Sequence, residues 1–111
     1  MNLDTNLDPR LARLQAVIRE RKSGEAGSSY VASLFAKGRA KIAQKVGEEA
    51  TETVIAALTG SAEELTSEAA DLLFHLMILL EDAGSGLDTV LTELERRDGV
   101  SGHVEKASRG G

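Results

Sequence analysis

The stretch from Lys45 to Met77 carries acidic side chains at spacings that could hold a metal ion: Glu48, Glu49, Glu52, Glu68 and Asp71. Glu49 and Glu52 are three residues apart, and so are Glu68 and Asp71, so each pair shares one face of a helix. Clustered carboxylates repel one another unless a cation lies among them. Because oxygen-only ligands favour hard cations, the pattern predicts Mg²⁺, with Mn²⁺ as the second candidate, rather than zinc or copper.

The two pairs are matched in register about Gly60. Glu52 lies eight residues before Gly60 and Glu68 eight after it, while Glu49 and Asp71 lie eleven before and eleven after. In an antiparallel helical hairpin this places the inner pair about 12 Å and the outer pair about 16 Å from the turn. An isolated Glu-x-x-Glu is usually a solvated helix surface. Two pairs in register indicate that the four carboxylates meet.

Helices are the elements that must position these acids. The apolar spacing predicts four helical stretches, at about residues 9–21, 29–60, 62–82 and 87–97. Asp8-Pro9 is a typical helix start, and Gly38 leaves open whether the second stretch is one helix or a short helix followed by a longer one. Gly60 ends that stretch, and Ser61 with Glu64 forms a capping box that starts the next helix. The hairpin turn is therefore expected near Gly60.

The sequence predicts an all-α fold without internal repeats. No run of β-branched residues alternates with polar ones, so no strand is expected. The composition, 41% hydrophobic and 28% charged, is typical of a soluble globular chain. We expect one domain over residues 1–111, with a helical core at about 8–97 and a tail at 98–111. The segment LLFHLMILL is apolar nearly all round, which in so short a chain favours a dimer.

The composition excludes several classes of function. The chain has no cysteine, so it has no disulfide and no thiolate metal site, and a reducing compartment such as the cytoplasm is expected. No segment reaches the roughly 18 consecutive apolar residues of a membrane span. The formal net charge of −5 argues against a general affinity for nucleic acid.

A basic segment precedes the acids and could bind phosphate groups. It contains Lys37, Arg39, Lys41 and Lys45, and the three lysines are spaced by four residues, which stacks them on one helical face. By charge alone, a solvated basic stripe explains the segment better than a phosphate site does. Lys45 also lies four residues before Glu49, so it either meets phosphate or pairs with that acid.

Four further side chains keep two readings each. Tyr30, Ser29 and Ser33 could contact a ribose or a base, but a helix cap and a core ring explain them equally well. His75 lies four residues after Asp71 on the same face. It is either a supporting partner of that carboxylate or, as the simpler reading, a packed core histidine.

The segments SYVASLFAKGRAKIAQKVGEEATETVIAAL, EAADLLFHLMILL and GVSGHVEKASR resemble the phosphoribosyl-ATP pyrophosphohydrolase family, and the acidic pattern is similar to the wider MazG-like pyrophosphohydrolases. The resemblance implies a four- to five-helix bundle of the all-α nucleoside triphosphate pyrophosphatase type, with helices packed across a homodimer. It implies Mg²⁺-dependent hydrolysis of phosphoribosyl-ATP to phosphoribosyl-AMP and pyrophosphate, in the second step of histidine biosynthesis. It also associates the lysines with phosphates.

In that reaction, metal on Glu49, Glu52, Glu68 and Asp71 would neutralise phosphate charge and activate a water. Glu48 is then either an extra ligand, the base that orients the water, or an exposed helix residue.

Three alternatives remain at this point. A house-cleaning pyrophosphohydrolase of free nucleoside triphosphates would use the same metal geometry. A carboxylate-bridged di-iron bundle would need Glu-x-x-His motifs, which are absent. A helical dimerisation module with an acidic surface would bind no divalent ion.

Overall fold

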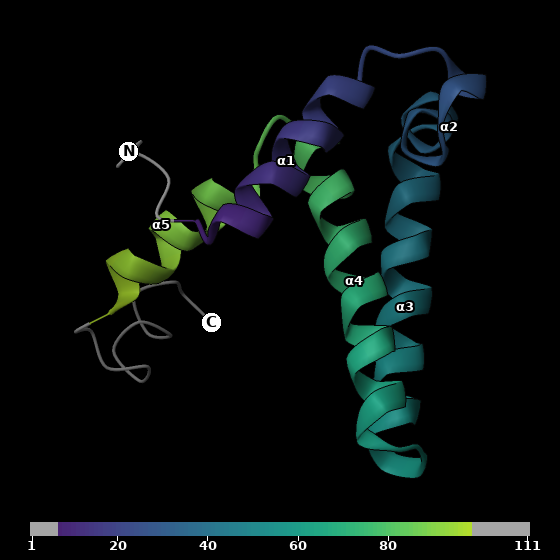
Figure 1. The fold of residues 1–111 in the computed structure, drawn as a ribbon, viewed down its shortest axis with the longest axis vertical. Helices are drawn as coiled ribbons and strands as arrows, with labels where there is room; N and C mark the ends of the chain where they lie inside the picture. The colour runs from purple at the N-terminus through teal and green to yellow at the C-terminus, as the bar shows by residue number, and fades with distance from the viewer. Residues whose placement is uncertain (1–6, 99–111) are drawn as a thin grey trace.

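The structure is a computed structural model that describes residues 7–98, and in this range it contains helices and no strand (Figure 1). Its elements are α1 (Pro9–Arg21), the 3₁₀ turn η1 (Ala26–Ser28), α2 (Tyr30–Lys37), α3 (Arg39–Thr59), α4 (Ala62–Asp82) and α5 (Leu87–Arg97). The predicted all-α class is confirmed. The expected tail lies outside the described residues apart from Asp98.

Helices α3 and α4 form the long antiparallel hairpin that the sequence predicts, and they pack side by side (Figure 1). The capping box is present at the turn: Ser61 Oγ accepts the Glu64 amide at 3.1 Å, and Glu64 Oε1 accepts the Ser61 amide at 2.8 Å. Gly60 has a φ of −107°, which any residue can adopt. A Cβ there would lie 2.9 Å from Glu64 Oε1 and 3.0 Å from the Ala56 carbonyl oxygen. A side chain at Gly60 would displace Glu64 and crowd the Ala56 carbonyl, so the turn favours glycine.

Gly38 separates α2 from α3, which settles the alternative that the sequence left open. Its φ is +100° and its ψ is 169°, a conformation essentially restricted to glycine, and it both ends α2 and precedes α3. Lys37 consequently belongs to α2, whereas Lys41 and Lys45 belong to α3. The expectation that the three lysines share one helical face is wrong for Lys37, because the break interrupts the helical period.

Charged side chains fasten α1 against the end of α4. Arg19 Nε lies 2.9 Å from both carboxylate oxygens of buried Glu81, and Arg19 Nη2 lies 3.3 Å from Asp88 Oδ1. Lys22 Nζ donates to the Glu81 carbonyl at 2.6 Å, at the end of α4 where the helix dipole is negative. These contacts fix the upper end of the hairpin, while α5 extends away from it and touches the other helices sparsely (Figure 1).

The core lies where α1, α2 and the first turns of α3 meet the second half of α4. Its buried members are Leu7, Ile18, Val31, Leu34, Ile42, Met77, Ile78 and Leu87. The lower half of the hairpin contributes none of them, and this is the half that holds the acidic residues. Among residues 7–98, no helix combines the length and apolar composition needed to cross a bilayer.

Candidate active site

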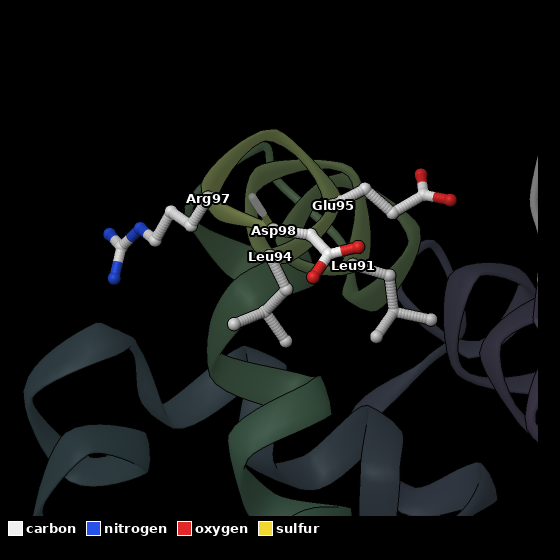
Figure 2. A pocket seen from close by; sticks show the side chains of 5 residues that line it. All are labelled: Leu91, Leu94, Glu95, Arg97 and Asp98. Atoms are coloured by element: carbon white, nitrogen blue, oxygen red, sulfur yellow. The ribbon is translucent and has the colours of Figure 1, made fainter. Parts of the chain in front are cut away.

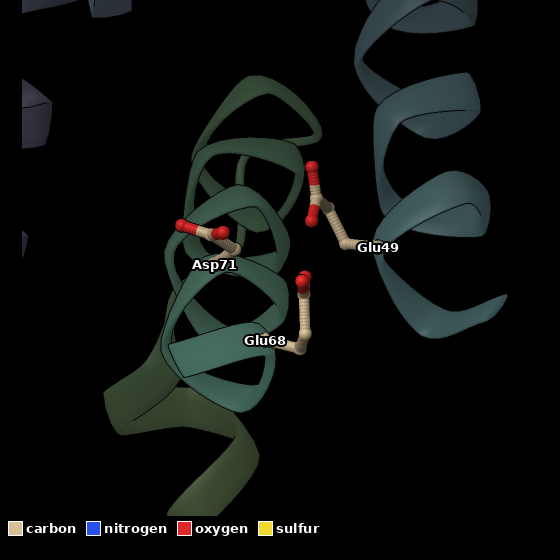
Figure 3. Close-up of side chains that lie close together, drawn as sticks. All are labelled: Glu49, Glu68 and Asp71. Carbon is tan, nitrogen blue, oxygen red and sulfur yellow. The ribbon is translucent and has the colours of Figure 1, made fainter. Parts of the chain in front are cut away.

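Three of the predicted metal ligands lie together between α3 and α4. Glu49, Glu68 and Asp71 each offer a carboxylate oxygen, and these oxygens lie within 4.8 Å of one another. Figure 3 shows Glu49 reaching from α3 toward α4, which carries the other two. The capped turn sets the register that brings residues on opposite arms to the same height. The cluster contains the predicted outer pair, Glu49 and Asp71, and one member of the inner pair, Glu68.

Two oxygens of this cluster are buried without a partner. Glu49 is 7% exposed, and neither Glu49 Oε1 nor Glu68 Oε1 has a hydrogen-bond partner among the described residues. An ionised oxygen that loses water without gaining a donor is strongly destabilised. A cation bound between the two helices would remove that cost. The set is composed only of carboxylate oxygens, which suits a hard divalent ion.

Glu52 lies beside this cluster rather than in it. It lines a hollow of about 220 Å³ on the hairpin, together with Glu68 and residues near the turn. Glu49 and Glu52 are three residues apart, so their side chains differ in direction by about 60° around the helix axis. The orientation of α3 points Glu49 at α4 and leaves the exposed Glu52 facing the hollow.

Lys45 stands next to the acids, as its spacing predicts. Its Nζ lies 3.6 Å from Glu48 Oε1 and 3.7 Å from Glu49 Oε2. Burial lowers the pKa of Lys45, but Tyr30 and the two nearby glutamates outweigh burial and raise it overall. Lys45 therefore stays cationic at the edge of the cluster.

Glu48 is exposed and already has partners. It accepts a hydrogen bond from Gln44 Nε2 at 3.0 Å, a contact that the sequence analysis did not identify although the i, i+4 spacing allows it. This hydrogen bond, together with the charge of Lys45, lowers the pKa of the Glu48 carboxyl. A lowered pKa makes a carboxylate a weaker base, which argues against Glu48 as the group that takes a proton from water.

The other basic residues are dispersed. Lys37 and Lys41 are exposed, on α2 and α3 respectively. Arg39 Nε instead donates to Asp82 Oδ2 at 2.9 Å, and its Nη2 donates to the Asp82 carbonyl at 3.0 Å. Arg39 thus ties the start of α3 to the end of α4 and is not free to bind a ligand without breaking that link.

Tyr30 and His75 form a contact that the sequence analysis missed. Tyr30 Oη lies 2.7 Å from His75 Nε2, and His75 Nδ1 lies 2.8 Å from the backbone carbonyl of Asp71. His75 is 5% exposed, so it is a core histidine, and it supports the Asp71 backbone rather than its carboxylate. The partners are 45 residues apart in sequence, and no spacing rule joins them.

The two serines near Tyr30 have structural roles in α2. Ser29 Oγ accepts the Ala32 amide at 3.0 Å and caps the helix, while Ser33 Oγ donates to the Tyr30 carbonyl at 2.7 Å. Tyr30 itself is 51% exposed, so the reading of Tyr30 as a core ring is wrong.

Comparison with known proteins places this site in a family. Residues 11–98 match the phosphoribosyl-ATP pyrophosphohydrolases, abbreviated PRA-PH. The chain belongs to the PRA-PH family. The phosphoribosyl-ATP pyrophosphatase of Erythrobacter litoralis is 63% identical over 100 residues, which cover 90% of this chain and 96% of that protein. Those of Novosphingobium aromaticivorans and Zymomonas mobilis are 64% and 60% identical over 99 residues, covering 89% of this chain and 92% of each relative.

The PRA-PH match spans all the predicted site residues, from Tyr30 to Asp71, and confirms the resemblance stated from the sequence. Membership also weighs against the two readings outside the family. The carboxylate cluster among the described residues contains no histidine, and both ring nitrogens of His75 are engaged elsewhere, so a Glu-x-x-His di-iron site does not fit. A dimerisation module would give no reason for two buried, unpartnered carboxylate oxygens.

Proposed function

We propose that this protein hydrolyses phosphoribosyl-ATP to phosphoribosyl-AMP and pyrophosphate, the second step of histidine biosynthesis. The observation that carries the proposal is the PRA-PH match over residues 11–98, because it includes both arms of a hairpin on which three carboxylates meet. The relatives at 60–64% identity bear the name phosphoribosyl-ATP pyrophosphatase. Each of these matches covers about nine-tenths of both chains.

Glu49, Glu68 and Asp71 are the proposed ligands of the divalent cation, with Glu52 able to join them from the adjoining hollow. The unpartnered oxygens of Glu49 and Glu68 support this assignment, and the all-oxygen set favours Mg²⁺, with Mn²⁺ as the alternative. When bound, the cation neutralises charge on the phosphate oxygens around the scissile anhydride bond.

Glu52 is the side chain that we assign to the attacking water. Its carboxylate is exposed to the hollow beside Glu68, and no partner competes for it among residues 7–98. A carboxylate in this position accepts the proton that water loses as its oxygen attacks phosphorus. Glu48 is assigned a supporting role, because its carboxylate is occupied by Gln44 and Lys45.

The three lysines and Tyr30 bind the substrate in this proposal, while Arg39 and Ser33 support the site. Lys45 neutralises phosphate charge next to Glu49, and the exposed Lys37 and Lys41 approach the outer phosphates from two helices. Arg39 acts through its bond to Asp82, which holds the end of α4 against the start of α3. Ser33 keeps Tyr30 in place through the Tyr30 carbonyl.

We further propose that residues 1–111 form one domain, with its helical core at about 8–97, that works as a homodimer. Two apolar surfaces support the dimer: one on α3, with Val54, Ile55 and Leu58 exposed, and one on α5 around Leu94. Leu91 and Leu94 project from the same side of α5 into a groove of about 500 Å³ (Figure 2). The Cα radius of gyration is 16.0 Å, whereas a compact chain of about 100 residues has about 13 Å. A second copy would fill this open shape.

Pyrophosphate release tests the proposal, with phosphoribosyl-ATP, ATP and the common deoxynucleoside triphosphates offered in Mg²⁺ or in chelator. We expect Mg²⁺-dependent turnover of phosphoribosyl-ATP, lost by at least a hundredfold in Glu52→Gln and Asp71→Asn. The matched control is Glu20→Gln, which removes the same charge from the exposed face of α1. Preference for a free triphosphate would move the protein to the house-cleaning group, and turnover of none of them would refute the hydrolase.

A further inference from the structure

The Tyr30–His75 contact links α2 to the metal-bearing helix and orients a phenol at the edge of the site. A carbonyl oxygen can only accept, so His75 Nδ1, 2.8 Å from the Asp71 carbonyl, must carry a proton. In the neutral ring the other nitrogen, Nε2, is then an acceptor, and the Tyr30 hydroxyl at 2.7 Å donates to it. The phenol has only one proton, and this hydrogen bond to His75 uses it.

The phenol oxygen still has a lone pair that can accept a hydrogen bond. Tyr30 is half-exposed, while His75 is buried. Phe74 packs against both rings. Its ring centroid lies 6.4 Å from the Tyr30 centroid, in a stacked arrangement, and 5.4 Å from the His75 centroid, in an edge-to-face arrangement. Tyr30 therefore offers a hydrogen-bond acceptor on a half-exposed side chain, and because its proton goes to His75 it cannot also serve as a donor.

The position of this acceptor relates it to the metal ligands. His75 lies four residues after Asp71, about 6 Å farther along α4, and Tyr30 Oη is hydrogen-bonded to the far side of that histidine ring. In a nucleotide the ribose is attached directly to the phosphate chain. When the phosphates are bound at Glu49, Glu68 and Asp71, the ribose therefore lies beside these residues. Phosphate oxygens are themselves acceptors and would be repelled by Tyr30, whereas ribose hydroxyls are donors.

We propose that Tyr30 is a specificity-determining residue whose phenol oxygen, oriented by His75, accepts a hydrogen bond from a hydroxyl of the ribose that carries the phosphate chain. His75 is a positioning residue in this arrangement. The inference rests on the proposed function, in that it needs a nucleotide in the site, but it adds that the enzyme distinguishes a ribose from a deoxyribose at this point.

Equilibrium binding tests this inference without turnover. Calorimetry would compare ATP, 2′-deoxy-ATP and 3′-deoxy-ATP in the presence of Ca²⁺, for the unaltered protein and for Tyr30→Phe. We expect the unaltered protein to bind one of the deoxynucleotides about three- to tenfold more weakly than ATP, the range of a single hydrogen bond. Tyr30→Phe should bind ATP as weakly as that deoxynucleotide and lose the preference.

His75→Leu tests the positioning role, because it leaves the phenol in place and removes its partner. It should lose the same preference, and the double variant with Tyr30→Phe should lose no more than either single variant, because both act through one hydrogen bond. Should His75→Leu fail to fold, His75→Gln, whose amide can both donate and accept, replaces it and should keep part of the preference. Thr92→Val, which removes an exposed hydroxyl from α5, is the control and should leave all affinities unchanged.

Several outcomes would overturn the inference. They are equal affinity of the unaltered protein for all three nucleotides, a preference that survives in Tyr30→Phe, or no nucleotide binding at all. A Tyr30→Phe protein that binds Mg²⁺ more weakly in the absence of nucleotide would also overturn it, since Tyr30 would then act only by supporting Asp71. A different result would refute the proposed function alone: the protein would not turn over phosphoribosyl-ATP but would still bind ribose and deoxyribose nucleotides with different affinities.

Discussion

At the scale of single residues, Glu49 is the side chain whose environment most needs a cation. It is buried on α3, with Oε1 unpartnered and Glu68 and Asp71 close by. We expect Glu49→Gln to weaken Mg²⁺ binding at least tenfold, or about 1.4 kcal/mol. In chelator the same variant should melt at or above the temperature of the unaltered protein, because an amide of equal shape relieves the repulsion among the acids.

Titration calorimetry with Mg²⁺ and thermal melts with and without chelator measure both quantities. Glu20→Gln is the control, because it removes the same single charge from an exposed site on α1. It should change neither the Mg²⁺ affinity nor the melting temperature. A Glu49→Gln protein with full Mg²⁺ affinity, or one that is much less stable in chelator, would contradict the assignment of Glu49 as a ligand. In the second case the carboxylate would be needed for the fold itself.

The sequence predicted the residues of this site better than their contacts. Register about Gly60 brings Glu49, Glu68 and Asp71 together because helical rise and a capped turn are local properties. It could not predict that Glu52 faces the adjoining hollow, because the rotation of α3 about its axis depends on the packing of the whole hairpin. The engagement of Arg39 by Asp82 is likewise a tertiary contact, between residues 43 apart.

At the scale of helices, Gly38 is the residue that turns α2 into α3. Its φ of +100° is unfavourable for any side chain, although a Cβ there would touch nothing within 4 Å. Gly38→Ala should therefore lower the free energy of unfolding by about 1–3 kcal/mol through backbone strain alone. Urea denaturation would measure it.

Gly47 provides the opposite control for that experiment. It lies within α3, where a Cβ would also touch nothing within 4 Å, and its φ is not positive. Gly47→Ala should raise the free energy of unfolding by about 0.5–1 kcal/mol, because alanine favours the helix. If Gly38→Ala instead raised the free energy of unfolding, as Gly47→Ala should, the strained conformation of Gly38 would be refuted.

The start of α1 predicts a dependence of stability on pH. Hydrogen bonds from the Arg10 side chain and amide lower the pKa of Asp8 from 3.8 to about 2. Because the folded pKa lies below the unfolded one, this stabilisation is fully present above about pH 4 and is lost as the pH falls toward 2. Asp8→Asn keeps a helix cap but does not titrate.

We therefore expect the unaltered protein to be more stable than Asp8→Asn at neutral pH, with the difference disappearing near pH 2. Denaturation at a series of pH values tests this, and NMR titration of the Asp8 carboxyl carbon gives the pKa directly. A carboxyl that titrates near 3.8, or a stability difference independent of pH, would show that the Arg10 hydrogen bonds do not form in solution.

The helix boundaries were predictable because their signals are local. Asp8-Pro9, Gly60 and the capping box of Ser61 and Glu64 act within a few residues, and α1 and α4 begin where these patterns indicate, at Pro9 and Ala62. The break at Gly38 remained open because a single glycine is compatible with either a continuous or an interrupted helix. Only the backbone conformation, with its positive φ, decides between them.

At the scale of the whole molecule, one copy of the chain leaves several large apolar side chains exposed to solvent. Leu58, near the end of α3, is 79% exposed, and Val54 and Ile55 are exposed on the same helix. The sequence indicated association through the all-round apolar segment of α4, but that segment is largely covered within the chain. The exposed apolar surface instead lies on α3 and α5, a distribution that depends on how the helices fold back on one another.

The last prediction concerns this surface. We expect the unaltered protein to sediment as a dimer and Leu58→Glu to sediment as a monomer at micromolar concentration, because dimer formation would bury an unpaired charge. Leu58 is exposed within one copy, so the substitution should not unfold the monomer, which circular dichroism would verify. Ser23→Glu places the same charge in the exposed loop after α1 and should remain dimeric. A monomeric unaltered protein would refute the homodimer, and a dimeric Leu58→Glu would place the interface elsewhere, with the groove of Leu91 and Leu94 as the next surface to alter.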